Sequence, residues 1–336
     1  MKEIFIHIGM PKCASTFLQK EIFPHLNDIY YLNLNEKANS IITEMVFANH
    51  LTFNLEKCKE QLHNIIDEIP ENKILISHEG FFGHLMYNFI DSYSSGKILK
   101  EIFPEAKILL IVRKQDDLLE SAFTYALMLG YRNSCNTFLN YDKNNKKFLN
   151  YRYQMTAPLN IDVKILNLLR YADYYSELFG QKNLNILPFE MIKEDKESFV
   201  KKVLDVLSSK QDMSELRLEK KNESFGYLSN WAFFVFNRFR SGEKCGINLI
   251  PEHPFHHTFV SKYKKSPVYR FFARVSVTIS LQVLFKYTIN KVDNILKIKK
   301  KFISSEKREI IMCMHAGSNK ELDEKYGTDL KKYKYY

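Results

Sequence analysis

Four short apolar runs set the hydrophobic pattern of this chain, and polar or charged residues end each of them. The runs cover residues 4–8, 73–80, 107–112 and 184–190. Such runs, rich in Ile and Leu, are typical of strands buried on both faces of a parallel sheet. A predicted helix over 171–180 ends at a glycine before the last run, and an amphipathic helix follows through Leu207. The pattern predicts an α/β fold with a central, mainly parallel sheet flanked by helices.

The first run breaks into a loop that carries a lysine and two hydroxyls. Ser15 and Thr16 stand where the next helix is expected to begin. In a strand, loop and helix of this kind, backbone N–H groups and the positive end of the helix dipole converge on one spot, which favours an anion. Lys12 adds a full positive charge. The sequence therefore predicts a phosphate site formed by Lys12, Cys13, Ala14, Ser15, Thr16 and Phe17.

This loop departs from the phosphate loop of kinases and nucleotide hydrolases. Gly9 and residues 14–16 partly fit the spacing of that motif, but Lys12 lies in the middle of the loop and not directly before the final hydroxyl. A lysine at this place would meet a different part of a nucleotide, such as the oxygen that bridges a 5′-phosphate to a leaving group.

A second polar pair follows the apolar run 107–112. Arg113 stands at the carboxyl end of this predicted strand, and Ser121 follows eight residues later in the first turns of the next predicted helix. The planar fork of an arginine matches the oxygens of a phosphate. We expect Arg113 and Ser121 to share one phosphate.

Together, the loop and the Arg113/Ser121 pair resemble the sulfotransferases that use 3′-phosphoadenosine 5′-phosphosulfate (PAPS) as donor. Residues 113–121 look like the bacterial carbohydrate-type branch of that superfamily. The resemblance implies a P-loop-type three-layer fold, in-line transfer of a sulfonate to a hydroxyl of a saccharide or glycolipid, and no metal. It implies that Lys12 stabilises the leaving phosphate and, through residues 220–224, that Asn222 lies on the 3′-phosphate side.

An ionisable pair ends the run 73–80. Ligands of parallel α/β sheets lie at the carboxyl ends of the strands, so His78 and Glu79 are expected to face the same crevice as Lys12 and Arg113. The resemblance nominates Glu79 as the catalytic base. Other branches place a catalytic histidine after the corresponding strand, so His78 stays a second candidate. Both could instead be structural, with Glu79 capping the next helix and His78 packing on the sheet.

Two residues of the loop depart from the family pattern. Ala14 stands where glycine is frequent, which removes easy access to positive φ and puts the shape of the loop in doubt. Cys13 stands where a hydroxyl is frequent, so one contact could be lost or taken over by a backbone N–H. A nucleophilic thiol is disfavoured, because no histidine lies close by in the sequence except His7, which would be inside the strand.

The chain is expected to form one sulfotransferase domain over residues 1–336. No Pro/Gly/Ser-rich linker divides it, and residues 319–333 look like the family ending. Two segments, about 133–160 and 240–305, are predicted insertions on the acceptor side. The first is expected to be a loop or a helix pair.

The composition predicts the location of the protein and the kind of partners it binds. The net charge of +10 suits an anionic nucleotide and an anionic or membrane-linked acceptor. Five cysteines without C-x-x-C spacing, and no visible signal at the N-terminus, predict a reduced, cytoplasmic location. Nucleic-acid binding ranks low, because no nucleic-acid motif accompanies the charge.

The basic and apolar region 262–301 is the main irregularity. Its charges make the apolar stretch too short for a transmembrane span. An interfacial helix at the inner face of a membrane, reaching lipid-linked glycans, is one reading, and an amphipathic insertion that packs on the core or on a second subunit of a homo-oligomer is the other. His253, His256 and His257 more closely fit a surface cluster than a metal site.

Two other functions stay open. A P-loop kinase or nucleotide hydrolase would require magnesium and a nucleoside triphosphate. A non-catalytic, basic membrane-surface binding protein would retain the fold without binding a nucleotide.

Overall fold

The computed structural model describes most of the chain. The described residues are 2–47, 51–129, 131–149, 160–216, 218, 226–239, 292, 295 and 300–336. The chain divides into two compact units, a larger one of residues 1–119, 139–222 and 305–336 and a smaller one of residues 120–138 and 223–304. The expectation of one domain over residues 1–336 stays a prediction.

A five-stranded parallel sheet forms the centre of the larger unit. Its strands are β1 (Glu3–Ile8), β2 (Tyr30–Tyr31), β3 (Lys73–His78), β4 (Lys107–Val112) and β7 (Leu184–Pro188), in the order β2-β3-β1-β4-β7. The four strands expected from the apolar runs are confirmed. Since all five are parallel, the residues that follow them meet at one edge of the sheet.

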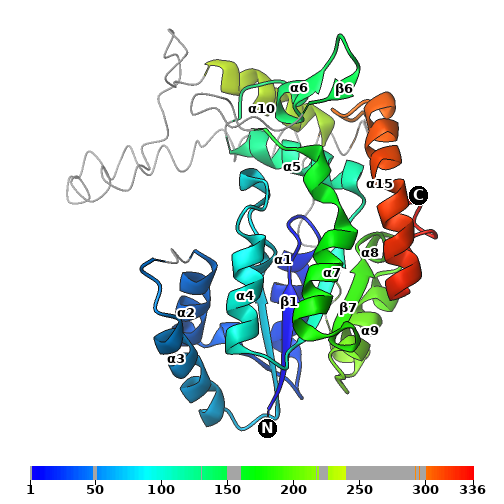
Figure 1. Ribbon diagram of the computed structural model, residues 1–336. Helices are drawn as coiled ribbons and strands as arrows, with labels where there is room; N and C mark the ends of the chain where they lie inside the picture. Colours follow the sequence, from blue (N-terminus) through cyan, green and yellow to red (C-terminus); the bar gives the residue numbers. More distant parts are fainter. Residues whose placement is uncertain are drawn as a thin grey trace. The chain divides into compact units, whose positions relative to one another are not determined.

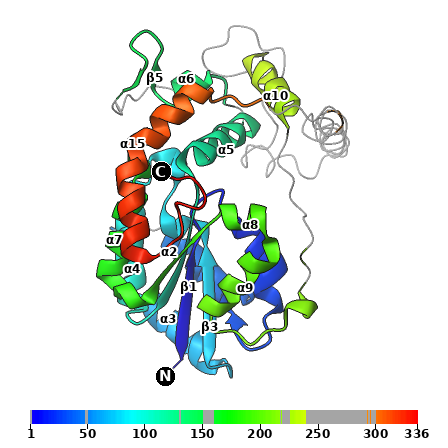
Figure 2. The same ribbon diagram turned by 90° about the vertical axis from the view of Figure 1, so that its right-hand side faces the viewer.

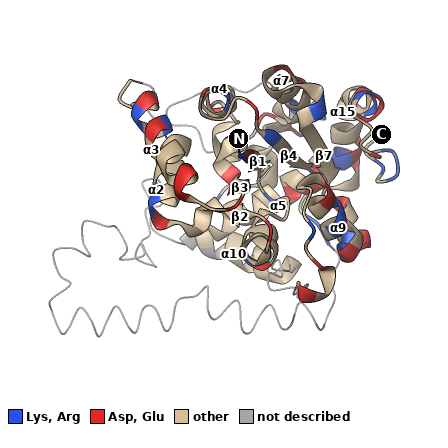
Figure 3. Cartoon of the chain, turned by 90° about the horizontal axis from the view of Figure 1, so that it is seen from below, with Lys and Arg blue, Asp and Glu red and all other residues tan. Residues whose placement is uncertain are grey.

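Helices cover both faces of this sheet. Figures 2 and 3 show α4 (Ser92–Ile102) and α7 (Leu168–Phe179) on one face, and α9 (Lys196–Val206) on the other. The C-terminal helix α15 (Ser305–Tyr326) packs on the outside of α7 (Figure 1). These three layers confirm the predicted α/β class.

Local sequence explains where several of the helices begin and where α7 ends. Asn35, Asn54 and Asn167 cap the N-termini of α2 (Glu36–Val46), α3 (Leu55–Glu68) and α7, each by accepting a backbone N–H. Gly180 ends α7 with a φ of 88°, as the predicted glycine stop requires.

The single helix expected after the last strand is two helices, α8 (Glu190–Glu194) and α9, because Asp195 adopts an extended backbone and caps α9.

Short elements join these parts. In the larger unit they are α1 (Ser15–Phe17), the π-helix η1 (Leu18–Ile22), and the 3₁₀ turns η2 (Phe23–His25), η3 (Leu32–Leu34), η4 (Glu79–Phe82), η5 (Leu85–Tyr87), η6 (Val163–Leu166), η7 (Gln181–Asn183) and η8 (Met213–Glu215). The segment 133–160 holds the helix α6 (Cys135–Phe138) and an antiparallel hairpin of β5 (Tyr141–Asp142) and β6 (Lys147–Phe148). A helix pair is therefore absent from its described part, and residues 150–159 lie outside the described residues.

The smaller unit is built around residues 120–128 of α5 (Gln115–Met128) and around α10 (Tyr227–Phe239). Asn237 of α10 donates to the carbonyl oxygens of Leu127 (2.7 Å) and Tyr131 (3.0 Å). The carboxylate of Glu120 accepts the backbone N–H groups of Phe302 (2.8 Å) and Ile303 (3.0 Å).

Most of the region 262–301 and the three histidines at 253, 256 and 257 lie outside the described residues. Within the described part of the chain, no helix combines the length and apolar character that crossing a bilayer requires.

Candidate functional site

The loop after β1 has a strained backbone. Lys12 has a φ of 66° and Ala14 a φ of 64°, so two residues with side chains adopt the left-handed conformation within three positions. Ala14 takes the N-cap position of α1 at this φ, and its carbonyl accepts the N–H groups of Phe17 (3.0 Å) and Leu18 (3.1 Å). The doubt that the sequence raised is thus resolved, because alanine takes the conformation that glycine would take more easily.

The loop lies directly against the end of β3. A Cβ atom on Gly9 would stand 2.6 Å from Oγ of Ser15 and 3.2 Å from Cα of Glu79. Only a glycine lets these groups approach so closely. The hydroxyl of Ser15 is buried and has no hydrogen-bond partner among the described residues. It still lies close enough to Glu79 to lower the pKa of that carboxyl.

Lys12 and Glu79 form an electrostatic pair at this edge. Burial raises the pKa of Glu79, and the positive charge of Lys12 opposes this rise. Burial likewise lowers the pKa of Lys12, an effect that Glu79 opposes and Arg113 strengthens. The site therefore holds a carboxyl whose proton affinity is above normal beside a lysine whose proton affinity is below normal, which is typical of functional clefts.

Arg113 reaches the loop from the end of β4. Its Nη1 donates to the backbone carbonyl of Lys12 (2.7 Å), and its guanidinium lies 4.5 Å from the ring centre of Phe189. The Nε atom is buried and has no hydrogen-bond partner among the described residues. A buried cationic donor without a partner is costly, so this atom is suited to an anion such as a phosphate. Sequence reasoning missed Phe189 as the residue that orients Arg113.

His78 and Glu79 differ in what their side chains do. Nδ1 of His78 accepts the backbone N–H of Gly80 (3.0 Å), so His78 caps the turn η4. Burial lowers the pKa of His78, and the nearby His84 lowers it further. From the sequence, Glu79 was expected to be the residue that would cap the next helix if the pair were structural. The structure gives the cap to His78, whereas Lys12 and Ser15 act on the carboxyl of Glu79 and lower its pKa against the effect of burial.

Two buried groups in this region are structural. The thiol of Cys13 is fully buried, its Sγ lies 3.5 Å from the carbonyl of Pro11, and burial raises its pKa far above the ordinary value. It therefore stays protonated and is a poor nucleophile. His7 lies inside β1, as expected, where its Nδ1 is 2.7 Å from Oγ of Ser77 and burial lowers its pKa to about 3.

The other predicted site residues lie in several places. Thr16 is exposed in α1, and the ring of Phe17 has Nζ of Lys196 5.6 Å from its centre. Ser121 lies in α5, within the smaller unit, so the predicted pairing with Arg113 stays a prediction. Asn222 lies outside the described residues.

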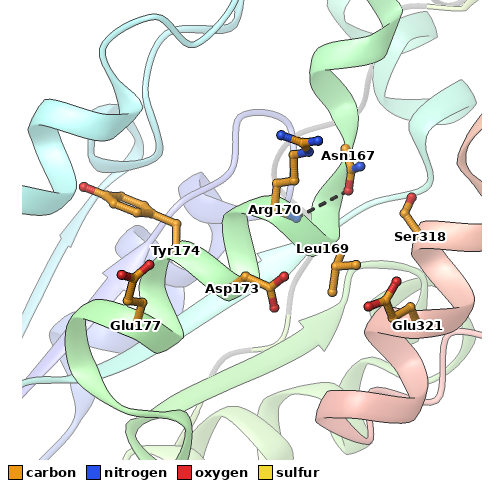
Figure 4. Close-up of a pocket in the computed structure, with 8 residues that line it drawn as sticks. All are labelled: Asn167, Leu169, Arg170, Asp173, Tyr174, Glu177, Ser318 and Glu321. Atoms are coloured by element: carbon orange, nitrogen blue, oxygen red, sulfur yellow. Dashed lines mark hydrogen bonds between the residues drawn. The ribbon is translucent and has the colours of Figure 1, made fainter.

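An open groove elsewhere in the larger unit lies between α7 and α15 (Figure 4). Its lining residues are Asn167, Leu169, Arg170, Asp173, Tyr174, Glu177, Ser318 and Glu321. Three of these are carboxylates, and Asp173 accepts hydrogen bonds from Lys325 and Tyr326 (both 2.8 Å). The groove shares no residue with the loop or the strand ends, and its charge does not suit an anion.

No group of three or more His, Cys, Asp or Glu side chains within the described ranges is arranged to hold a metal ion. The site at the strand ends brings together two basic residues, Lys12 and Arg113, and one carboxyl, Glu79.

Comparison with known proteins gives structural matches alone. No family model and no curated sequence matches this chain. Among solved structures, a sulfotransferase from Alicyclobacillus acidocaldarius matches with 17% identity over 71% of this chain and 93% of its own (TM-score 0.43).

Mouse sulfotransferase SULT7A1 complexed with PAP matches with 16% identity over 82% and 89% (TM-score 0.31), and the sulfotransferase domain from the curacin biosynthetic pathway with 12% over 66% and 79% (TM-score 0.34). At these TM-scores the matches do not by themselves establish an activity.

Proposed function

We propose that this chain is a sulfotransferase that moves a sulfonate from PAPS to the hydroxyl of an acceptor. The observation that carries the proposal is the meeting of three side chains at the ends of three adjacent parallel strands. Glu79 follows β3, the loop with Lys12 follows β1, and Arg113 follows β4 and donates to the loop. A base, a cation for a leaving group and a phosphate ligand are the groups that sulfonate transfer requires.

The residues fit the nucleotide part of this donor. The buried Nε of Arg113 provides an unused donor for a phosphate, and Lys12 provides a charge in the loop. The donor supplies the sulfonate and a good leaving phosphate. Ser121 and Asn222 are further proposed ligands of the 3′-phosphate, on the basis of their places in the sequence.

Each residue of the chain then has a defined task. Glu79 removes the proton of the acceptor hydroxyl as the new O–S bond forms, and its raised pKa brings its proton affinity closer to that of a base working near neutral pH. Lys12 stabilises the negative charge on the phosphate oxygen as the old S–O bond breaks. His78 is the weaker candidate for the base, because its Nδ1 already accepts a backbone N–H and its pKa is lowered.

The proposed acceptor is a saccharide or glycolipid. The resemblance of residues 113–121 to the carbohydrate-type branch supports this class, and the net charge of +10 suits an anionic or membrane-linked glycan. A cytoplasmic enzyme, peripheral at the inner face of the membrane and homo-oligomeric, is the corresponding proposal for its location and assembly.

One observation favours the alternative of a P-loop kinase or nucleotide hydrolase. Glu79 follows β3, the strand that pairs directly with β1, and a carboxylate there could bind a magnesium ion beside the loop. The position of Lys12 in the middle of the loop opposes this function, because the phosphate-binding lysine of such enzymes directly precedes the final hydroxyl.

Nucleotide affinity separates these functions. We would measure binding of 3′-phosphoadenosine 5′-phosphate, 5′-AMP, and ATP with magnesium to the wild type, to Arg113→Ala and to Arg170→Ala. Arg170 is an exposed arginine on α7 and serves as the matched control. Selective binding of the 3′-phosphorylated nucleotide, lost only in Arg113→Ala, is the expected result. Preference for ATP with magnesium would indicate the kinase or hydrolase, and binding of none of the three would indicate the non-catalytic protein.

A further inference from the structure

A cluster of buried polar side chains contacts the backbone on either side of Arg113. Its members are Gln115, Glu190, Asn319 and Tyr335, of which Gln115, Asn319 and Tyr335 have no exposed surface and Glu190 is 9% exposed. Three come from segments remote in sequence from the end of β4. Buried polar groups are kept only where they are hydrogen-bonded and where their geometry matters.

This cluster holds the backbone on both sides of Arg113. Before it, the carbonyl of Val112 accepts the N–H of Phe189 (2.7 Å) and lies 3.3 Å from the hydroxyl oxygen of Tyr335. After it, the N–H of Lys114 donates to Oε1 of Glu190 (3.3 Å).

One hydroxyl connects the two sides. Tyr335 donates to Oε2 of Glu190 at 2.6 Å. Its oxygen also lies next to the carbonyl of Val112, so it links Glu190 to the end of the strand that precedes Arg113. Burial raises the pKa of Tyr335 well above its ordinary value, with a further rise from Glu190. The hydroxyl therefore remains a donor throughout the usual pH range.

The C-terminal tail is fixed by amide contacts. Nδ2 of Asn319 in α15 donates to the backbone carbonyl of Tyr335 (2.9 Å). Asn319 and Gln115 exchange side-chain hydrogen bonds of 2.8 and 3.2 Å, and Gln115 is the first residue of α5, two positions after Arg113. The penultimate residue of the chain is thus tied to the segment that carries the phosphate ligand.

We propose that Tyr335 is a positioning residue for Arg113, acting with Glu190 to hold the guanidinium against the loop, so that the C-terminal tail forms part of the donor site. The inference rests on the proposed function in one respect, that Arg113 binds the 3′-phosphate of the nucleotide. Tyr335 does not touch the nucleotide in this arrangement. It determines where the guanidinium lies when the nucleotide arrives.

The variant Tyr335→Phe tests this, because it removes one oxygen without changing charge or ring packing. The readout is selectivity, the affinity for 3′-phosphoadenosine 5′-phosphate divided by that for 5′-AMP. We expect selectivity to fall about tenfold, as when a hydrogen bond to a charged group is lost, while 5′-AMP binds as before. The matched control is Tyr336→Phe in the same tail, whose hydroxyl donates to Asp323 (2.8 Å) and whose loss leaves selectivity unchanged.

A double-mutant cycle with Arg113→Ala shows whether Tyr335 acts through Arg113. In the Arg113→Ala background, Tyr335→Phe is expected to cause no further loss of selectivity. Asn319→Ala, which releases the backbone of Tyr335, is expected to reduce selectivity in the same way and provides a second variant should Tyr335→Phe be too unstable to assay.

The outcomes are distinct. A selective wild type whose selectivity survives Tyr335→Phe and Asn319→Ala overturns the inference and leaves the proposed function intact. An equal loss of affinity for both nucleotides, together with a lower melting temperature, also overturns it, since that result describes a structural residue. A wild type without any preference for the 3′-phosphate refutes the proposed function itself, and the inference with it.

Discussion

Gly9 is the residue at which packing can be related most directly to the site. The change Gly9→Ala adds one methyl group where Oγ of Ser15 would be 2.6 Å away and the backbone Cα of Glu79 3.2 Å away. The φ of Gly9 lies outside the left-handed region, so the effect comes from space alone. Ser15 is buried and the second contact involves backbone, so neither neighbour can yield freely.

The expected cost of this overpacking is about 1–3 kcal/mol of unfolding free energy. Gly317→Ala is the control with the opposite sign. Gly317 lies within α15, nothing stands within 4 Å of its added methyl group, and helix propensity predicts a gain of about 0.5–1 kcal/mol. Both residues belong to the larger unit, so the comparison holds even where the two units unfold separately.

Denaturant midpoints measure the stability of both variants. Initial rates of the proposed sulfonate transfer measure how well the site keeps its geometry. Because the new methyl group displaces Glu79, the rate of Gly9→Ala is expected to fall about 100-fold, while Gly317→Ala keeps the rate of the wild type. A Gly9→Ala protein with the midpoint and the rate of the wild type would refute the close contact between the loop and the end of β3.

Four further predictions concern the same loop and the residues around it. Ala14→Gly relieves a left-handed alanine but adds freedom to the unfolded chain, so it should change stability by less than about 1 kcal/mol in either direction, measured by denaturant midpoint, with nucleotide affinity retained.

Burial raises the pKa of Glu79 above 4.5, so kcat/KM should rise with pH through that raised pKa. Stability should fall over the same interval, because the folded state binds the proton more tightly than the unfolded state, and Glu79→Gln should remove both effects in pH titrations. His78→Asn, which can keep the cap, should retain most activity, and a loss as large as that of Glu79→Gln would instead make His78 the base. Brief alkylation followed by mass spectrometry should label the exposed Cys313 before the buried Cys13.

The sequence predicts the sheet well, since strands covered on both faces need continuous apolar residues. The strand over 107–112 was located residue by residue as β4. The two residues of β2 are too few to make such a signal. The break between α8 and α9 at Asp195 carried a local signal, an Asp that caps the next turn, but the surrounding amphipathic pattern obscured it.

The candidate site could be predicted only in part. The residues that follow strands, Lys12, Glu79 and Arg113, were found because parallel strands bring their ends together. The cap made by His78 and the contact between Tyr335 and Glu190 were not predicted. No sequence pattern shows whether the N–H of Gly80 will bond to His78 or to the adjacent Glu79. Tyr335 and Glu190 are 145 residues apart in the chain, so no local pattern predicts their contact.

The strained loop explains why these remote contacts matter. Two left-handed residues with side chains cost free energy and persist only where the surroundings hold them in place. Three contacts do so here: the buried side chain of Cys13 between them, the bond from Arg113 to the carbonyl of Lys12, and the close approach of Gly9 to Glu79. Arg113 holds the loop through this bond, and the proposed function gives it a second task, to receive the phosphate. If Tyr335 positions Arg113 as we propose, a change at Tyr335, and not at the neighbouring Tyr336, should alter the loop that follows the first strand.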